Sequence, residues 1–206
     1  IFDPAAPSLL PVVFQKTPPN ILIVFMESFS GRLTSVYNDD YPSLTPGLEE
    51  IAQNPFTTTV HNYYNSSTPT ETGMLSQLCS FLPPTGHGEM NTNILKEHKL
   101  LCLPEILAQH GYAARRYFTG VKKEYAGKDQ IFGNMDVGIS GEEEMKEWIT
   151  DAPKSWGFSD HQMFPALWQI MQEQNARPFF FMTSTIDSHP PFNLSRDATP
   201  YGNGKN

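Results

Sequence analysis

Residues 20–27, NILIVFME, are the stretch that decides the fold. The run is apolar without alternation and ends in an acid, Glu27, which is typical of a strand buried on both faces of a parallel sheet. A second such run, residues 178–189 (PFFFMTSTIDSH), ends in Asp187 and His189. Because helical patterns lie between the two runs, the sequence predicts an α/β fold with a mainly parallel sheet and helices on both faces.

Local patterns place the other elements along the chain. Apolar spacing, turn residues and candidate helix caps indicate each of them. In chain order we predict a short helix capped by Thr45 with Pro46 at its first position, a strand over residues 56–65 (FTTTVHNYYN), a helix over residues 70–81, a helix and a strand on either side of Gly111, and an amphipathic helix capped by Ser159 or Asp160 with Pro165 inside it.

Composition limits the class of protein. The chain has 206 residues, of which 39% are hydrophobic and 12% aromatic, so it is long and apolar enough for one globular domain. Its formal net charge of -8 argues against nucleic acid as a partner, because a nucleic-acid binder shows a basic face. Residues 1–19 are rich in proline and indicate a linker or edge segment, followed by a domain over residues 20–206.

The sequence has no apolar run near the roughly 20 residues that a membrane helix needs, and no signal peptide opens it. Its two cysteines, Cys79 and Cys102, match no zinc-binding spacing. They could form one disulfide in an oxidising compartment or remain two buried thiols, and we expect a structural role in either case.

Residues 66–72, SSTPTET, hold five hydroxyl side chains where a helix is expected to begin. Such side chains cap helices, since their oxygens accept hydrogen bonds from the free N–H groups of the first turn. One of them could instead be a nucleophile at a helix N-terminus, where the dipole favours an anion. Ligands gather beyond the carboxyl ends of strands in such folds, and Glu27, this cluster and residues 187–189 are all expected there. Their convergence favours the nucleophile.

A hydroxyl nucleophile needs a base or a metal that lowers its pKa, and carboxylate and hydroxyl oxygens are ligands for hard or borderline metals. The order NILIVFMES, TPGLEEIA, STPTETGMLSQLCSFLP, LPEILAQHGY, WGFSDHQMF and TSTIDSHPPF resembles the sulfatase-like branch of the alkaline phosphatase superfamily. Within it, the chain is similar to lipoteichoic acid synthases and related phosphoglycerol transferases, over residues 20–193.

The resemblance implies roles for individual residues. Glu27, directly after the first strand, would bind a divalent metal, either Mn, Mg or Zn. Thr70, at the start of the nucleophile helix, would bind the same metal and accept the phosphoglycerol group, with Thr72 as the alternative register. His189, in the segment SHPPF, and Lys128 would contact the substrate phosphate.

The chain departs from the family pattern in three places. Lys128 replaces the family's arginine, and Ala126 stands where a tryptophan is expected two positions earlier. The family completes its metal site with an Asp-His pair well beyond the SHPPF turn, whereas the only adjacent pair here, Asp160–His161, matches a different family segment. We therefore expect the first two-thirds of a catalytic domain, which by itself binds metal weakly and turns over little.

The function that the resemblance implies is transfer of a phosphoglycerol-type headgroup from an anionic phospholipid, through a phosphothreonine at Thr70. The enzyme would be extracytoplasmic and held by membrane segments outside this chain. One alternative is a sulfatase or phosphodiesterase acting on a soluble phosphate or sulfate ester. Residues 67–71 partly match a sulfatase signature in which Ser67 would become formylglycine, although Glu71 replaces its arginine. A non-catalytic lipid-sensing module that kept the fold is a further alternative.

The remaining polar residues are expected to have simpler roles. Asp187 either supports the site or merely ends its strand. Surface or structural roles are expected for His61, His87, His98, His110, His161 and the acidic run 142–147 (EEEMKE).

Overall fold

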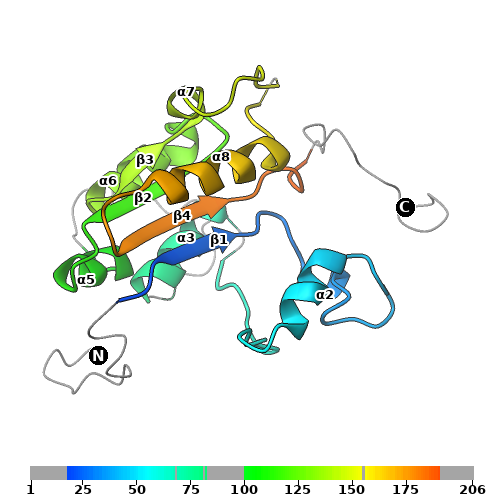
Figure 1. Cartoon of the computed structure of the whole chain (residues 1–206). Coiled ribbons are helices and arrows are strands. Elements are labelled where there is room, and N and C mark those ends of the chain that lie inside the picture. The colour runs from blue at the N-terminus through cyan, green and yellow to red at the C-terminus, as the bar shows by residue number, and fades with distance from the viewer. Residues whose placement is uncertain (1–17, 68, 81, 83–99, 155, 191–206) are drawn as a thin grey trace, which may run out of the picture.

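The computed structural model describes residues 18–67, 69–80, 82, 100–154 and 156–190. The predictions for residues 1–17, for His87 and His98 and for the end of the SHPPF segment lie outside this part. Within it, one sheet of four parallel strands has the order β1-β4-β2-β3, which confirms the predicted α/β fold (Figure 1). The strands are β1 (Ile21–Phe25), β2 (Ala114–Phe118), β3 (Gly138–Ser140) and β4 (Phe179–Ser184).

The two apolar runs occupy different places in this sheet. β4 pairs with a strand on each side, and five of its six residues are buried, as expected for a central strand. β1 lies at the edge of the sheet among the described strands, and its Leu22 and Val24 are exposed. The prediction of a first strand is confirmed, but the prediction that it is buried on both faces is wrong for the described part of the chain.

Helices cover both faces of the sheet (Figure 1). Phe180 and Met182 of β4 pack with buried side chains of α3 and α6, whereas Phe179 and Phe181 pack with α8 on the opposite face. This alternation follows from the side-chain period of two along a strand. The helices of the first face are α3 (Thr70–Cys79), α5 (Leu103–Gln109) and α6 (Lys128–Asn134), and those of the second are α7 (Glu142–Met145) and α8 (Asp160–Glu173).

The predicted helix starts are confirmed at both ends of the domain. Thr45 is the N-cap of α2 (Pro46–Gln53), which has Pro46 at its first position. Ser159 is the N-cap of α8, and its N–H and hydroxyl both donate to the side chain of Gln162. Pro165 lies inside α8 on its exposed side. In the part of the chain that the structure describes, no helix has the length and hydrophobicity to cross a membrane.

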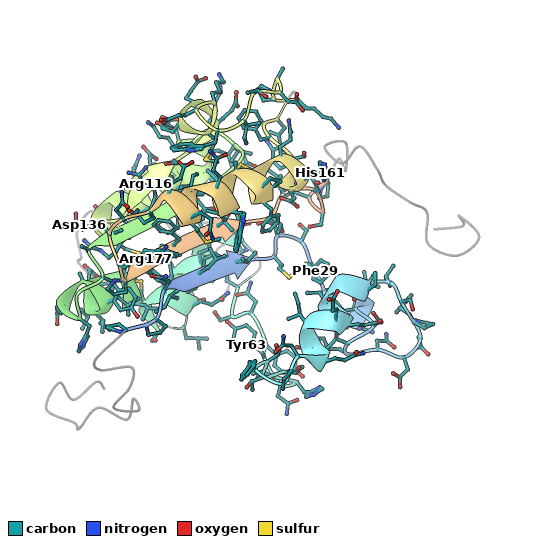
Figure 2. All side chains as sticks on the ribbon, in the orientation of Figure 1. Phe29, Tyr63, Arg116, Asp136, His161 and Arg177 are labelled. Atoms are coloured by element: carbon teal, nitrogen blue, oxygen red, sulfur yellow. A yellow bond between two sulfur atoms is a disulfide. The ribbon has the colours of Figure 1, made fainter. Side chains whose placement is uncertain are left out.

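Residues 56–65 form no strand, so the prediction of a second strand there is wrong. Their large side chains are exposed, Phe56 by 96% and Tyr64 by 83%. β-branched and aromatic residues stabilise a strand only where they pack on a neighbouring strand or face. The stretch belongs instead to a lobe that extends away from the sheet, on which Figure 2 labels Phe29 and Tyr63. The lobe contains η1 (Gly31–Leu33) and α2 (Pro46–Gln53).

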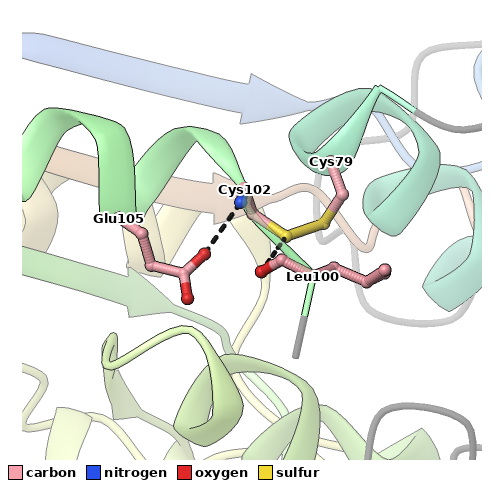
Figure 3. The surroundings of a disulfide bond; sticks show 4 residues. All are labelled: Cys79, Leu100, Cys102 and Glu105. Atoms are coloured by element: carbon pink, nitrogen blue, oxygen red, sulfur yellow. Dashed lines mark hydrogen bonds between the residues drawn. A yellow bond between two sulfur atoms is a disulfide. The ribbon is translucent and has the colours of Figure 1, made fainter. Parts of the chain in front are cut away.

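A disulfide between Cys79 and Cys102 joins the end of α3 to the residue before α5 (Figure 3). The structure therefore selects the disulfide over two free thiols. The Cys102 N–H also donates to Glu105 Oε2 at 2.8 Å, which holds the first turn of α5 beside the bond. The disulfide fastens the far end of the helix that begins with Thr70.

Candidate active site

Polar groups meet at the carboxyl edge of the sheet, where β1 and β4 end side by side. The segment after β4 holds the segment after β1 in place. The Thr185 N–H donates to the Phe25 carbonyl at 3.0 Å, and the Glu27 N–H donates to Thr185 Oγ1 at 2.9 Å. The Ser188 hydroxyl donates to the Glu27 carbonyl. These bonds fix Glu27, half-buried, just beyond the end of β1.

Thr70 is the first residue of α3, and its hydroxyl points to Glu27. Thr70 Oγ1 donates to Glu27 Oε2 at 2.8 Å. The N-cap of α3 is Pro69, which makes no side-chain cap hydrogen bond. The hydroxyl cluster therefore does not cap this helix in the way that its composition suggested, and one of its members faces an acid.

One other member of the cluster, Ser66, and its neighbour Asn65 fasten the loop to α3. Ser66 Oγ donates to Ser76 Oγ, which in turn donates to the Gly73 carbonyl at 2.8 Å. The Asn65 side chain lies directly against Gly73, where an added Cβ would come within 2.9 Å of Asn65 Nδ2. Because these contacts hold the loop on the helix, the position of Thr70 relative to Glu27 is fixed from both sides.

Lys128 is brought to the same edge by a tight turn. η2 (Tyr125–Gly127) precedes it, with a left-handed backbone at Ala126, and the Lys128 side chain is buried. Its ammonium lies 3.9 Å from Glu71 Oε1 and 4.9 Å from the centre of the Tyr125 ring. Burial lowers the pKa of Lys128, and the negative charges of Glu71 and Glu27 partly oppose that shift.

Aromatic rings stand next to these charges. The Trp156 ring centre is 4.5 Å from that of His189 and 5.8 Å from that of Tyr125. The His189 N–H donates to the Ile186 carbonyl at 2.9 Å, so the turn after β4 holds the histidine in place. His189 was predicted from the sequence to lie in the site, whereas Trp156 and Tyr125 were not. The one feature of the sequence that points to Trp156 is its position directly before a glycine in WGFSD, because a glycine permits a close backbone contact.

That glycine explains how Trp156 reaches the site. Gly157 has a φ of +137°, and a Cβ there would lie 2.2 Å from the Gly120 carbonyl oxygen. A Cβ at Gly120 would in turn lie 2.3 Å from the Phe158 carbonyl oxygen. Two backbones cross here at a distance that only glycine allows. The crossing brings Trp156 against Val121 and Ile186.

Glu27, Thr70, Lys128, Trp156 and His189 line one cavity of about 50 Å³. A volume of this size holds an ion with a few waters or a small anionic group. Among the described residues, its lining includes Thr70 but neither Thr72, whose side chain is buried, nor Ser67. The lining residues are Glu27, Thr70, Glu71, Thr119, Val121, Tyr125, Lys128, Trp156, Ser184, Thr185, Ile186 and His189.

Asp160 supports the turn that carries His189 and does not line the cavity. Its Oδ1 accepts from the Ile186 N–H at 2.8 Å, and its Oδ2 accepts from the Asp187 N–H at 3.1 Å. Burial raises the pKa of Asp160 from 3.8 to about 6, against the effect of these two backbone hydrogen bonds, and Asp187 adds to the rise. Asp187 Oδ1 is itself buried without a hydrogen-bond partner within the described residues.

Two oxygen-bearing side chains at the cavity could serve as part of a metal site. The Glu27 carboxylate and the Thr70 hydroxyl are adjacent oxygen donors, which Mg²⁺ and Mn²⁺ prefer and Zn²⁺ also accepts. Within residues 18–190, apart from the gaps given above, no group of three or more His, Cys, Asp or Glu side chains could hold a metal ion. Glu27 and Thr70 would therefore be only part of a ligand set, and a metal would need further ligands.

Comparison with known proteins gives the context of this geometry. The model of the Sulfatase family matches residues 19–206. The chain is 27% identical over 187 residues to phosphoglycerol transferase I of Citrobacter koseri, covering 85% of this chain and 24% of that protein. Its identity to phosphoglycerol transferase I of Escherichia coli is 26% over 182 residues, covering 84% and 24%. The chain thus spans about a quarter of the length of the curated relatives it matches.

Two solved structures share the fold. One is the lipoteichoic acid synthase LtaP from Listeria monocytogenes, with a TM-score of 0.72 and 20% identity, covering 88% of this chain and 43% of that one. The other is a protein in the alkaline phosphatase superfamily from Vibrio parahaemolyticus, also with a TM-score of 0.72 and 20% identity, covering 98% and 49%. At this identity the likeness establishes the fold alone.

Proposed function

Because the chain belongs to the sulfatase family, we propose that it carries the nucleophile of a metal-dependent enzyme that transfers a phosphoglycerol-type headgroup from a lipid. The hydrogen bond of 2.8 Å from Thr70 to Glu27 is the observation that carries this proposal. It places a hydroxyl against a carboxylate at the carboxyl edge of a parallel sheet, where ligands bind in folds of this type. The names of the curated relatives supply the substrate class.

In the proposed reaction, Thr70 Oγ1 attacks the phosphorus of the headgroup phosphodiester. The bond from phosphorus to the lipid alcohol breaks, and that alcohol leaves with the proton that Thr70 Oγ1 gives up. The headgroup phosphate remains esterified to Thr70 until an acceptor alcohol attacks the phosphorus, and the Thr70 oxygen then leaves and takes up the proton of that alcohol. Glu27 Oε2 accepts the hydrogen bond of the hydroxyl and so orients Oγ1 before the attack. The N–H groups of the first turn of α3 would donate hydrogen bonds to the phosphate, because a helix N-terminus favours an anion.

Glu27 and Thr70 are the residues of this chain that would hold a divalent metal, whether Mn, Mg or Zn. Such an ion lowers the pKa of a coordinated hydroxyl and neutralises phosphate charge. Lys128 and His189 would contact the phosphate oxygens from the other lining segments. A buried ammonium stabilises charge that develops in the transition state more strongly than an exposed one does.

The proposed location is extracytoplasmic, at a membrane that contains the lipid donor. The disulfide between Cys79 and Cys102 supports this location, because disulfides persist in oxidising compartments. Anchoring to the membrane would come from segments other than the described helices.

Turnover of a lipid donor by the full-length protein tests the proposal. We expect Thr70→Ala to abolish release of the headgroup, because the attacking oxygen is gone. The matched control is Thr150→Ala, which removes an exposed hydroxyl outside the cavity lining. Unchanged release by Thr70→Ala would exclude Thr70 as the nucleophile. Product that appears only with water as acceptor would make the enzyme a phosphodiesterase, and activity on soluble sulfate esters instead would favour a sulfatase.

A further inference from the structure

Glu71 stands in the cavity directly after Thr70 and has no role in the reaction described above. Its carboxylate lies 3.9 Å from the Lys128 ammonium, which is beyond hydrogen-bonding distance. Within the described residues, no hydrogen bond reaches either the Glu71 carboxylate or the Lys128 ammonium. Both groups line the cavity, so the acceptors of one and the donors of the other are open to a bound molecule.

An acid in this place is costly for a site that binds only phosphate. Its negative charge repels the phosphate oxygens, and it also partly neutralises the cation that would attract them. A carboxylate is favourable there only if the ligand also brings a hydrogen-bond donor. The rings of Tyr125 and Trp156 line the same cavity and offer faces on which the carbon skeleton of a small headgroup can lie.

We propose that Glu71 selects the headgroup, by accepting a hydrogen bond from a hydroxyl or ammonium group carried by the alcohol that is esterified to the phosphate. Lys128 then binds the phosphate, and Glu71 binds the hydroxyl or ammonium group of the alcohol. The two side chains therefore contact opposite ends of one small molecule. This inference rests on the proposed function for the phosphate itself. It adds a chemical requirement on the transferred group that the reaction at Thr70 does not impose.

Equilibrium binding of three phosphate monoesters to the full-length, metal-loaded protein tests this selection. Glycerol phosphate carries hydroxyl donors, phosphoethanolamine carries an ammonium, and methyl phosphate carries neither. We expect the wild-type protein to bind one or both donor-bearing esters at least about tenfold more tightly than methyl phosphate, as a hydrogen bond to a charged group implies. Glu71→Ala should remove this preference and leave methyl phosphate bound equally well or more tightly.

A second substitution distinguishes the two donors. Glu71→Gln keeps an acceptor but removes the charge, so it should abolish the preference for phosphoethanolamine and retain part of a preference for glycerol phosphate. Glu147→Gln is the matched control, because Glu147 is exposed and outside the cavity lining. If Glu71→Ala fails to fold, Glu71→Asp, which retracts the carboxylate by one methylene, should still reduce the preference.

Equal weakening of all three esters in the Glu71 variants would overturn the inference, as would a wild-type protein that does not discriminate among them. Binding needs no turnover, so the result is independent of the test of Thr70. Discrimination without headgroup transfer would contradict the proposed function alone. Transfer without discrimination would contradict the selection by Glu71 alone.

Discussion

The positions of some residues at the carboxyl edge of the sheet could be predicted from the sequence, whereas those of others could not. Glu27 and Thr70 were predicted to converge because each follows a strand or opens a helix at that edge. The burial of Lys128 was not predictable, since it depends on a left-handed residue at Ala126, a conformation that alanine rarely adopts. The position of Trp156 depends on a backbone crossing between Gly120 and Gly157, which lie 37 residues apart, and no local pattern reveals it.

Gly157→Ala tests that crossing. The new Cβ would lie 2.2 Å from the Gly120 carbonyl oxygen, and a φ of +137° is unfavourable for alanine. We expect the free energy of unfolding to fall by about 2 kcal/mol or more, as strained non-glycine backbone implies. Denaturant unfolding measures the change. Gly47→Ala in α2, where an added Cβ meets nothing within 4 Å, is the matched control and should be neutral or slightly stabilising. A loss as small as that of the control would contradict the close crossing.

Helices and strands lie where the sequence predicted them if their apolar residues both follow a regular pattern and become buried in the fold. β4, β2 and the starts of α2 and α8 lie where apolar spacing and cap residues predicted them, and α3 begins where apolar spacing predicted it. The predicted strand over residues 56–65 failed because composition alone carried it, without a partner strand to pair with. The exposure of β1 on one side could not be read from its apolar run, because the order of strands in a sheet is a property of the whole fold.

The disulfide between α3 and α5 is expected to stabilise the helix that carries Thr70. It closes a segment with a sequence separation of 23 residues. Restricting the unfolded chain over such a length contributes about 3 kcal/mol in the chain-entropy model. Replacing both cysteines by serine should lower the free energy of unfolding by about that amount, measured in denaturant without reductant. The wild-type protein with reductant should show the same loss, and a variant as stable as the oxidised protein would contradict the role.

Asp160 is expected to make the turn after β4 sensitive to pH. Its pKa is raised from 3.8 to about 6 in the folded chain, so the folded state binds a proton more tightly than the unfolded state does. The free energy of unfolding should therefore decrease as the pH rises from 3.8 to about 6, and the decrease should be complete above that range. Denaturant midpoints across this window measure it. Asp160→Asn should remove this component, and an unchanged pH dependence in the variant would show that other groups cause it.

At the scale of the whole molecule, the described fold brings the Glu27 carboxylate, the Thr70 hydroxyl and the buried Lys128 ammonium to one cavity. If Glu27 and Thr70 hold a metal as proposed, its remaining ligands come from other parts of the full-length protein. Glu27→Gln in that protein should lose most of its bound divalent metal, since a neutral amide is a weaker ligand than a carboxylate. Metal content by elemental analysis measures this, with Glu147→Gln as the control. Full occupancy in Glu27→Gln would exclude Glu27 as a ligand.

If the proposed reaction is right, Thr70 becomes covalently modified by the phosphate of a lipid headgroup. Mass spectrometry of the peptide over residues 61–84, from full-length protein purified from its own membranes, detects this modification. We expect a phosphoglycerol-type adduct on Thr70. Formylglycine at Ser67, or an adduct on Thr72 with Thr70 unmodified, would contradict it.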